Sequence, residues 1–153
     1  MEAHSSLRDA IVAETRDWLD TPYHHQQSTK GAGCDCLGLL RGVWRGVIGP
    51  EPARAPNYSR DWAEASGRET LLEACAQWLE PYPLPRGETG MPGDVIVFRM
   101  VQGRPAKHCA IVVAPGRMIH SLEGHGVRED DIAEFMRARR TVRIAGAFSF
   151  PGA

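Results

Sequence analysis

A short segment with two cysteines offers the clearest chemistry in this sequence. In GAGCDCLGLLRGVW (31–44), Cys34 and Cys36 flank Asp35 after a glycine-rich stretch, and apolar residues at helical spacing follow. Cys36 is therefore expected in the first turn of a helix, where unpaired N–H groups and the helix dipole favour the thiolate. The same N–H groups can bind the oxyanion of a tetrahedral intermediate. This arrangement favours a cysteine nucleophile that attacks an acyl carbon.

Two histidines lie where they could assist such a nucleophile. His108 opens the β-branched run HCAIVVA, and His120 lies in the next such run, GRMIHSL. The turn APGR falls midway between them, so a hairpin would bring the two rings close together across the ladder. A cysteine nucleophile needs a base and a group that orients the base. Cys36, His108 and His120 therefore form a plausible triad, although six histidines allow other combinations.

Other uses of these cysteines remain open. A cysteine after a loop is often a small buried hydrophobic residue, and we expect that role for Cys34, Cys75 and Cys109. A zinc site would use His24, His25, Cys34 and Cys36. Structural zinc sites prefer two to four residues between paired cysteines, and a disulfide across one residue is strained, so neither alternative is favoured. We expect no metal and no organic cofactor.

Length and composition indicate an ordinary globular protein. The 153 residues predict a single domain over 1–153, and a net charge of −1 gives no general attraction to nucleic acid. No apolar run reaches the roughly 18 residues of a membrane span, so none is expected. The first residues lack the pattern of a secretory leader, so we expect synthesis in the cytoplasm without a signal peptide.

The elements that must position the triad are helices followed by strands. Hydrophobic periodicity predicts an α+β fold in which N-terminal helices pack on a C-terminal antiparallel sheet. Loops are expected over 20–33 and 81–93, where prolines and glycines interrupt the patterns. The expected helices are 5–20, 35–48, 61–80 and 128–139, and the expected strands are 94–100, 108–114, 116–122 and 141–150.

Laid out in order, these motifs resemble the NlpC-type cysteine peptidases of bacterial cell walls, which have a papain-like fold. The matching segments are TPYHHQQSTKGAGCDCLGLLRGVW, MPGDVIVFR and KHCAIVVAPGRMIHS, which together span roughly residues 20–122. The resemblance implies Cys36 as nucleophile, His108 as base and His120 as the third polar residue. A neutral third residue stabilises an imidazolium less than a carboxylate would, so His120 is expected to matter less than the other two.

The resemblance also gives two nearby residues a role. It places Tyr23 close to the nucleophile, where its hydroxyl could meet the oxyanion or a substrate amine; the alternative is a packed loop tyrosine. It implies that Asp35 holds a substrate ammonium group, with simple N-capping of the helix as the alternative reading. One departure is Leu37, where many members have a serine that helps to recognise a free amino terminus.

The implied reaction is hydrolysis of an amide in peptidoglycan stem peptides, at the bond between γ-D-glutamate and the diamino acid. The segment CDCLGLLRGVW looks most similar to the subgroup found in phages and gene transfer agents. In that case the enzyme would join a particle tail, with hub or baseplate proteins as partners, and act in the periplasm or cell wall. The alternatives are a papain-like acyltransferase or amidase with another substrate, and a catalytically silent tail subunit.

Overall fold

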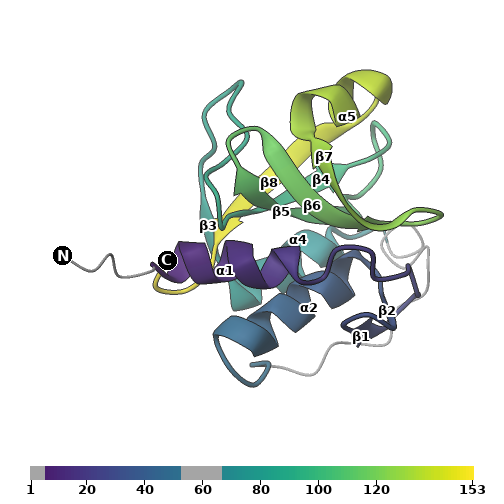
Figure 1. Ribbon diagram of the computed structural model, residues 1–153. Coiled ribbons are helices and arrows are strands. Elements are labelled where there is room, and N and C mark those ends of the chain that lie inside the picture. Colours follow the sequence, from purple (N-terminus) through teal and green to yellow (C-terminus); the bar gives the residue numbers. More distant parts are fainter. Residues whose placement is uncertain (1–5, 53–66) are drawn as a thin grey trace.

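An antiparallel sheet separates two layers of helices (Figure 1). The computed structural model describes residues 6–52 and 67–153. In this part of the chain, three helices cover one face of the sheet and a short fourth helix lies on the other face. They are α1 (Leu7–Arg16), α2 (Cys36–Val47) and α4 (Thr70–Trp78) on the first face and α5 (Ile132–Ala138) on the second.

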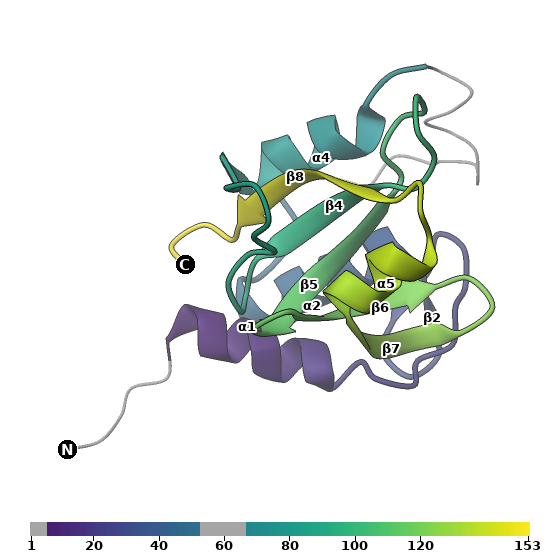
Figure 2. The ribbon, with the colours of Figure 1, turned by 90° about the horizontal axis from the view of Figure 1, so that it is seen from above.

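The sheet has six strands in the order β3-β8-β4-β5-β6-β7, all antiparallel to their neighbours (Figure 2). The expected α+β class, with helices before an antiparallel sheet, is confirmed. The last strand does not simply extend the meander, because β8 returns to lie between β3 and β4. The strands are β3 (Glu80–Tyr82), β4 (Val95–Arg99), β5 (His108–Ala114), β6 (Arg117–Leu122), β7 (Gly126–Asp131) and β8 (Arg143–Ser149).

Alternation along β5 divides the core between the two faces of the sheet. Cys109 and Ile111 belong to the larger cluster, which α1, α2 and α4 cover. Ala110 and Val112 belong to the smaller cluster, together with Phe135 of α5. Side chains at successive strand positions point to opposite faces, so a histidine at the start of this strand shares the α5 face. The ring centroids of His108 and Phe135 are indeed 6.2 Å apart.

The expected helix over 128–139 is wrong in its first part. Residues Gly126–Asp131 form β7, which pairs along its whole length with β6, and the helix begins only at Ile132. The strand is highly charged because it is the outermost strand of the sheet, where opposite charges can pair across to the neighbouring strand. Arg117 of β6 and Glu129 of β7 form such a pair at 2.5 Å.

Two other expectations also changed. The expected loop 81–93 begins as β3, a strand too short and too proline-rich to show a two-residue pattern. In the expected loop 20–33, β1 (Ser28–Thr29) forms a small hairpin with β2 (Gly33–Cys34), which ends one residue beyond the loop. Of the expected helix 61–80, residues 61–66 lie outside the described residues, and the helix within the described part is α4.

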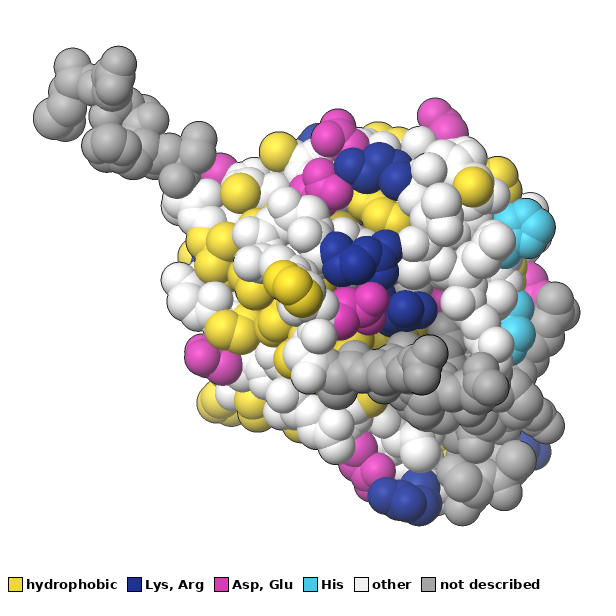
Figure 3. Space-filling view, turned by 90° about the horizontal axis from the view of Figure 1, so that it is seen from below, with side chains coloured by type: hydrophobic (Ala, Val, Ile, Leu, Met, Phe, Trp, Pro, Cys, Tyr) yellow, Lys and Arg dark blue, Asp and Glu magenta, His cyan; other side chains and the backbone are white. Residues whose placement is uncertain are grey.

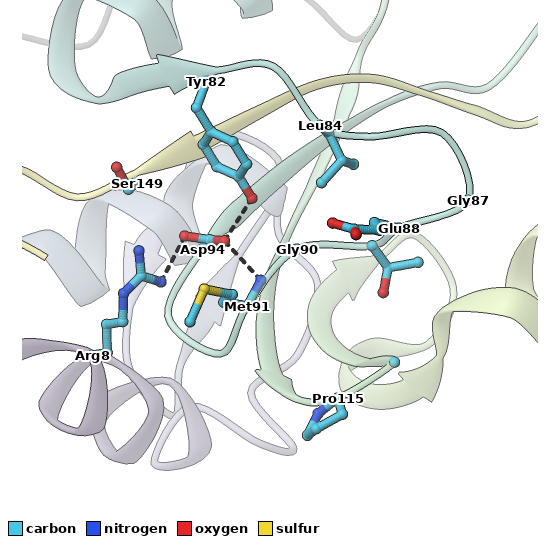
Figure 4. A pocket seen from close by; sticks show the side chains of 12 residues that line it. Arg8, Tyr82, Leu84, Gly87, Glu88, Gly90, Met91, Asp94, Pro115 and Ser149 are labelled. Carbon is cyan, nitrogen blue, oxygen red and sulfur yellow. Dashed lines mark hydrogen bonds and ion pairs between the residues drawn. The ribbon is translucent and has the colours of Figure 1, made fainter.

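A buried carboxylate ties α1 to the start of β4, at the end of that strand away from His108. Asp94 accepts hydrogen bonds from Arg8 Nη1 at 2.7 Å, from the Tyr82 hydroxyl at 2.6 Å and from the Met91 backbone at 2.8 Å (Figure 4). Because Arg8 comes from α1 and Tyr82 from β3, one side chain fixes three elements.

The helical underside of the molecule carries both signs of charge. Figure 3 shows basic and acidic side chains lying next to one another on this face. Arg41 and Arg45 of α2, for example, both pair with Glu51, at 2.7 and 3.0 Å. No helix in the described residues is long and apolar enough to cross a membrane.

Candidate active site

The N-terminus of α2 is built to present Cys36. Asp35 is the N-cap, and its Oδ1 accepts the backbone N–H of Gly38 at 2.7 Å, so Cys36 becomes the first residue of the helix. The preceding loop lies against this turn so closely that a Cβ on Gly38 would come within 1.9 Å of the Gln27 carbonyl oxygen. Glycine at this position therefore lets the loop and the helix N-terminus meet.

The loop itself is held by the same carboxylate. Asp35 is buried, and its Oδ2 accepts the backbone N–H of Gln26 at 2.8 Å. The N-capping role expected as one reading of Asp35 is thus present, and the side chain also clamps the loop. Tyr23 forms a parallel β-bridge with Cys34, which lies two residues before Cys36. The Tyr23 backbone therefore lies beside the segment that leads into α2.

The three residues of the predicted triad come together at the start of β5. Cys36 Sγ lies 3.8 Å from the carbonyl oxygen of Lys107, the residue before His108, and its thiolate is hydrogen-bonded to His108. His108 Nε2 lies 2.8 Å from His120 Nδ1. Both histidine side chains are buried, and both pack near Phe135 of α5. The hairpin of β5 and β6 therefore brings the two histidines together as its turn predicted.

The chain of contacts continues to a residue that the sequence did not single out. Asp130 of β7 places Oδ2 2.7 Å from His120 Nε2, and its Oδ1 lies 3.0 Å from Arg128. The expected helix over 128–139 concealed this contact, because it placed residue 130 on a helix and away from the sheet. The strand sequence GVREDD has no apolar alternation, so no local pattern in the sequence could have located Asp130.

This order of contacts determines the tautomers of both rings. The Asp130 carboxylate only accepts hydrogen bonds, so His120 Nε2 carries the proton. Burial, together with the nearby His108, lowers the pKa of His120 to about 4, so its ring is neutral and Nδ1 accepts. His108 Nε2 must then donate to it. His108 Nδ1 is left as the nitrogen that exchanges a proton with Cys36.

The environment favours the Cys36 thiolate despite burial. Hydrogen bonds from Cys109 and His108, with the charge of His108, lower the pKa of Cys36 to about 5, whereas burial and the Asp35 charge act against this. No described residue accepts a hydrogen bond from the backbone N–H of Cys36, so that donor can bind an anion at the helix N-terminus. The site thus has an activated sulfur, a proton carrier and an oxyanion donor.

The other cysteines differ from Cys36. Burial raises the pKa of Cys34 and of Cys75 to about 12, so both thiols stay protonated. Cys34 also accepts, through its carbonyl, a hydrogen bond from Ser121 at 2.7 Å. Cys109 was expected only to pack; it is buried, but it also donates to the Cys36 carbonyl at 3.4 Å.

Two hollows lie beside these elements. One of about 380 Å³ is lined by Tyr23 and by His125 of the β6–β7 turn, among others, so it adjoins the loop that leads to Cys36. Another of about 520 Å³ lies at the end of β4 away from His108, where Asp94 forms part of its wall (Figure 4), and neither a cysteine nor a histidine lines it. No group of three or more histidine, cysteine or acidic side chains in the described residues could hold a metal ion, the set His24, His25, Cys34 and Cys36 included.

Comparison with known proteins agrees with this architecture. The NlpC2 protein of Trichomonas vaginalis superposes with a TM-score of 0.62 at 17% identity, over 98% of this chain and 48% of that one. The NlpC/p60 domain of the peptidoglycan hydrolase SagA gives 0.59 at 21% identity, over 94% of this chain and 98% of that domain. The peptidoglycan hydrolase RipB of Mycobacterium tuberculosis gives 0.51 at 18% identity, over 94% and 62%.

These structures confirm the expected papain-like NlpC-type fold, and this chain spans about half the length of the Trichomonas protein. A search of curated protein sequences gave no match. The sequence model of the NlpC/P60 family matches residues 20–146, which is most of the chain and includes Cys36, His108, His120 and Asp130. The chain therefore belongs to the NlpC/P60 family.

Proposed function

We propose that this protein is a cysteine peptidase that hydrolyses an amide in the peptide stems of peptidoglycan, at the bond between γ-D-glutamate and the diamino acid. NlpC/P60 proteins are a family of cell-wall peptidases, which supports the general class. The single observation that carries the proposal is the continuous chain of contacts from the Cys36 thiolate through His108 and His120 to Asp130.

The first half-reaction is acylation of Cys36. The thiolate attacks the carbonyl carbon of the scissile amide, and the backbone N–H of Cys36 stabilises the oxyanion. The Tyr23 hydroxyl is proposed as a second donor or as a contact to the substrate amine. The C–N bond breaks as His108 gives the proton on Nδ1 to the leaving nitrogen. The products are a free amine and a thioester on Cys36.

The second half-reaction releases the acyl group. His108 takes a proton through Nδ1 from a water molecule, which attacks the thioester, and the C–S bond breaks to restore the thiolate. During both steps His120 keeps Nε2 of His108 in place as a donor, and Asp130 keeps His120 in the matching tautomer. The carboxylate of Asp130 supplies the charge that a neutral third residue lacks. No step requires a metal or a cofactor.

Substrate recognition is proposed for the loop side of the site. The family resemblance assigns the binding of a substrate ammonium group to Asp35, and we propose this role in addition to its bonds with Gly38 and Gln26 and its 3.8 Å approach to His25 Nδ1. Leu37 is buried, and its side chain has no hydroxyl at the position where many members have serine. Recognition of a free amino terminus at that position would have to come from Asp35 or Tyr23.

The biological setting is a further part of the proposal. The resemblance of CDCLGLLRGVW to the phage and gene transfer agent subgroup supports a tail-associated enzyme, made in the cytoplasm and acting on the wall after particle attachment. Its partners would then include tail hub or baseplate proteins. A papain-like amidase or acyltransferase with another substrate would use the same four residues, so only product analysis separates these readings.

The test is digestion of purified stem peptides by wild type and by Cys36→Ala, with mass spectrometry of the products under reducing conditions. The proposal predicts a new carboxylate on γ-D-glutamate and a new amine on the diamino acid, both absent with the variant. Cleavage at another amide would correct the bond. No cleavage by a folded wild-type protein would contradict the proposed substrate.

A further inference from the structure

A second thiol lies directly behind Cys36. Cys109 is the second residue of β5, on the sheet face that packs against the helices, and it is only 2% exposed. Its Sγ lies 3.4 Å from the Cys36 carbonyl oxygen, and its proximity lowers the pKa of the Cys36 thiol. Cys36 itself is partly exposed. A reagent from solvent would therefore react with Cys36 first, because Cys109 is buried next to it.

The remaining cysteines are placed differently. All four cysteines of the chain are free thiols, and among the described residues Cys109 is the only other cysteine that is hydrogen-bonded to Cys36. Cys34 is separated from Cys36 by one residue, which would make a strained disulfide ring. Cys75 lies on α4, where burial keeps it protonated. Cys109 is thus the thiol best placed to react with a modified Cys36.

We propose that Cys36 and Cys109 form a reversible disulfide when the protein meets a peroxide, and that this disulfide switches the site off and protects the nucleophile. The inference rests on the part of the proposed function that makes Cys36 a reactive thiolate; it does not depend on the substrate.

The chemistry takes place in two balanced steps. The Cys36 thiolate attacks one oxygen of the peroxide, the O–O bond breaks, and the products are a sulfenic acid on Cys36 and, from hydrogen peroxide, hydroxide. The Cys109 sulfur then attacks the sulfenic sulfur, and the S–S bond forms as the S–O bond breaks. The Cys109 proton leaves with the sulfenic hydroxyl as water. Overall the Cys36 thiolate and the Cys109 thiol are oxidised to a disulfide, and one hydrogen peroxide is reduced to one hydroxide and one water molecule.

The environments of the two sulfurs suit their different roles, in which Cys36 reacts with the peroxide and Cys109 with the sulfenic acid. Contact with the Cys36 charge and burial keep the pKa of Cys109 well above its ordinary value, so this thiol is a poor target for peroxide itself. Without a neighbouring thiol, a sulfenic acid is oxidised further to sulfinic and sulfonic acids, which thiols do not reverse. Cys109 therefore decides whether oxidation of the site can be undone.

The experiment treats the full chain with hydrogen peroxide and follows intact mass and mapped peptides. The wild type should become about 2 Da lighter through a Cys36–Cys109 disulfide, and dithiothreitol should restore alkylation of Cys36 by iodoacetamide. Cys109→Ser should instead become about 32 or 48 Da heavier at Cys36, with no recovery. Cys75→Ser is the matched control, because it removes another buried thiol, and it should behave as the wild type.

The outcomes separate this inference from the proposed function. Circular dichroism of each variant before treatment shows whether it is folded. Sulfinic or sulfonic acid at Cys36 in the wild type, formed as fast as in Cys109→Ser, would overturn the switch alone, and so would a disulfide to Cys34 or Cys75. A Cys36 that iodoacetamide fails to label in untreated protein at pH 7 would overturn both the switch and the proposed nucleophile.

Discussion

We expect Cys36 to be reactive because specific hydrogen-bond donors outweigh the cost of burying its charge. The Cys109 thiol and the His108 ring stabilise the thiolate, and the start of α2 adds backbone N–H groups that point toward it. The lowered pKa of Cys36 is therefore a property of its neighbours, and removing a neighbour should change it in a calculable direction.

The pH dependence of Cys36 alkylation tests the largest of these effects. In the wild type the rate with iodoacetamide should rise with a midpoint near pH 5, because only the thiolate reacts and its pKa is about 5. Cys109→Ala removes a donor to the thiolate, so the charged form is less stable and the midpoint moves to higher pH. Cys109→Ser keeps a donor and should stay near the wild type. An unchanged midpoint in Cys109→Ala would contradict the assignment.

Asp130 is predicted to act as a positioning residue through His120. Asp130→Ala should lower kcat by up to about a hundredfold with little effect on KM, since a displaced His108 fails in proton transfer rather than in substrate binding. Asp130→Asn, whose amide oxygen can still accept from His120 Nε2, should recover part of the loss.

Glu129→Gln is the matched control for that experiment. Glu129 is the neighbouring residue of β7, and it pairs with Arg16 and Arg117 instead of the histidines. Its substitution should leave kcat unchanged. If Glu129→Gln and Asp130→Ala lowered kcat equally, the effect would come from the stability of β7 and not from the histidine relay.

The sequence allowed three of the four residues in the contact chain from Cys36 to Asp130 to be proposed. Cys36, His108 and His120 stand beside strong local signals, namely a helix N-terminus and two apolar strand patterns. Asp130 has no such signal, because its role depends on pairing between β6 and β7 and on a diagonal reach to His120. The participation of Cys109 likewise depends on how α2 packs on β5, which no local pattern reports.

At the scale of elements, the junction between the loop 20–33 and α2 holds the nucleophile in place. Gly38 and Asp35 act together there. Gly38 has no side chain and so lets the loop pack against the helix, and the Asp35 carboxylate accepts hydrogen bonds from Gln26 in the loop and from Gly38 in the helix. The start of α2 and its N-cap were predicted from the sequence, because capping and periodicity are local. β3 and β7 were not, since a short edge strand with a proline, or one with a run of charged residues, lacks an apolar pattern.

Alanine substitutions at two glycines of α2 test this junction. Gly38→Ala places a Cβ 1.9 Å from a backbone oxygen, which cannot move without shifting the loop, so it should lower the free energy of unfolding by about 1–3 kcal/mol and reduce alkylation of Cys36. At Gly46 the Cβ would meet the flexible Glu14 side chain, and the change should be below about 1 kcal/mol. Chemical denaturation measures both. Equal losses would contradict the role given to Gly38.

At the scale of the whole molecule, the histidine relay links stability to pH. His120 is fully buried, and its pKa falls from 6.5 in the unfolded chain to about 4 in the folded protein. At a pH between these two pKa values, His120 is protonated in the unfolded state but not in the folded state. Stability is therefore lost as the pH falls from 6.5 through about 4. The contribution of this one group is about 3 kcal/mol.

Denaturation at a series of pH values measures this contribution. The free energy of unfolding of the wild type should decrease steeply across that window. His120→Gln, which cannot titrate but can still donate to Asp130, should be less stable at neutral pH and should show a shallower decrease. Parallel curves for the two proteins would mean that His120 titrates normally in the fold, and the tautomer assignment would then be wrong.

The overall architecture was predicted as a class, but its strand order was not. The succession of helical and strand patterns predicts an α+β domain, and the motifs from Pro22 to His120 indicate the family fold. The insertion of β8 between β3 and β4 joins segments about 45 to 70 residues apart in the chain, and such pairing depends on tertiary contacts that local patterns do not encode.

The central claim is that the Cys36 sulfur forms the covalent intermediate of amide hydrolysis. The most direct measurement mixes a γ-D-glutamyl-diamino acid stem peptide with excess enzyme, stops the reaction in acid and maps the mass of every cysteine peptide, alongside release of the amine. We predict a thioester of the acyl half on Cys36 that appears with the first turnover, and no amine from Cys36→Ala. Release of the amine by Cys36→Ala at the wild-type rate would contradict the account.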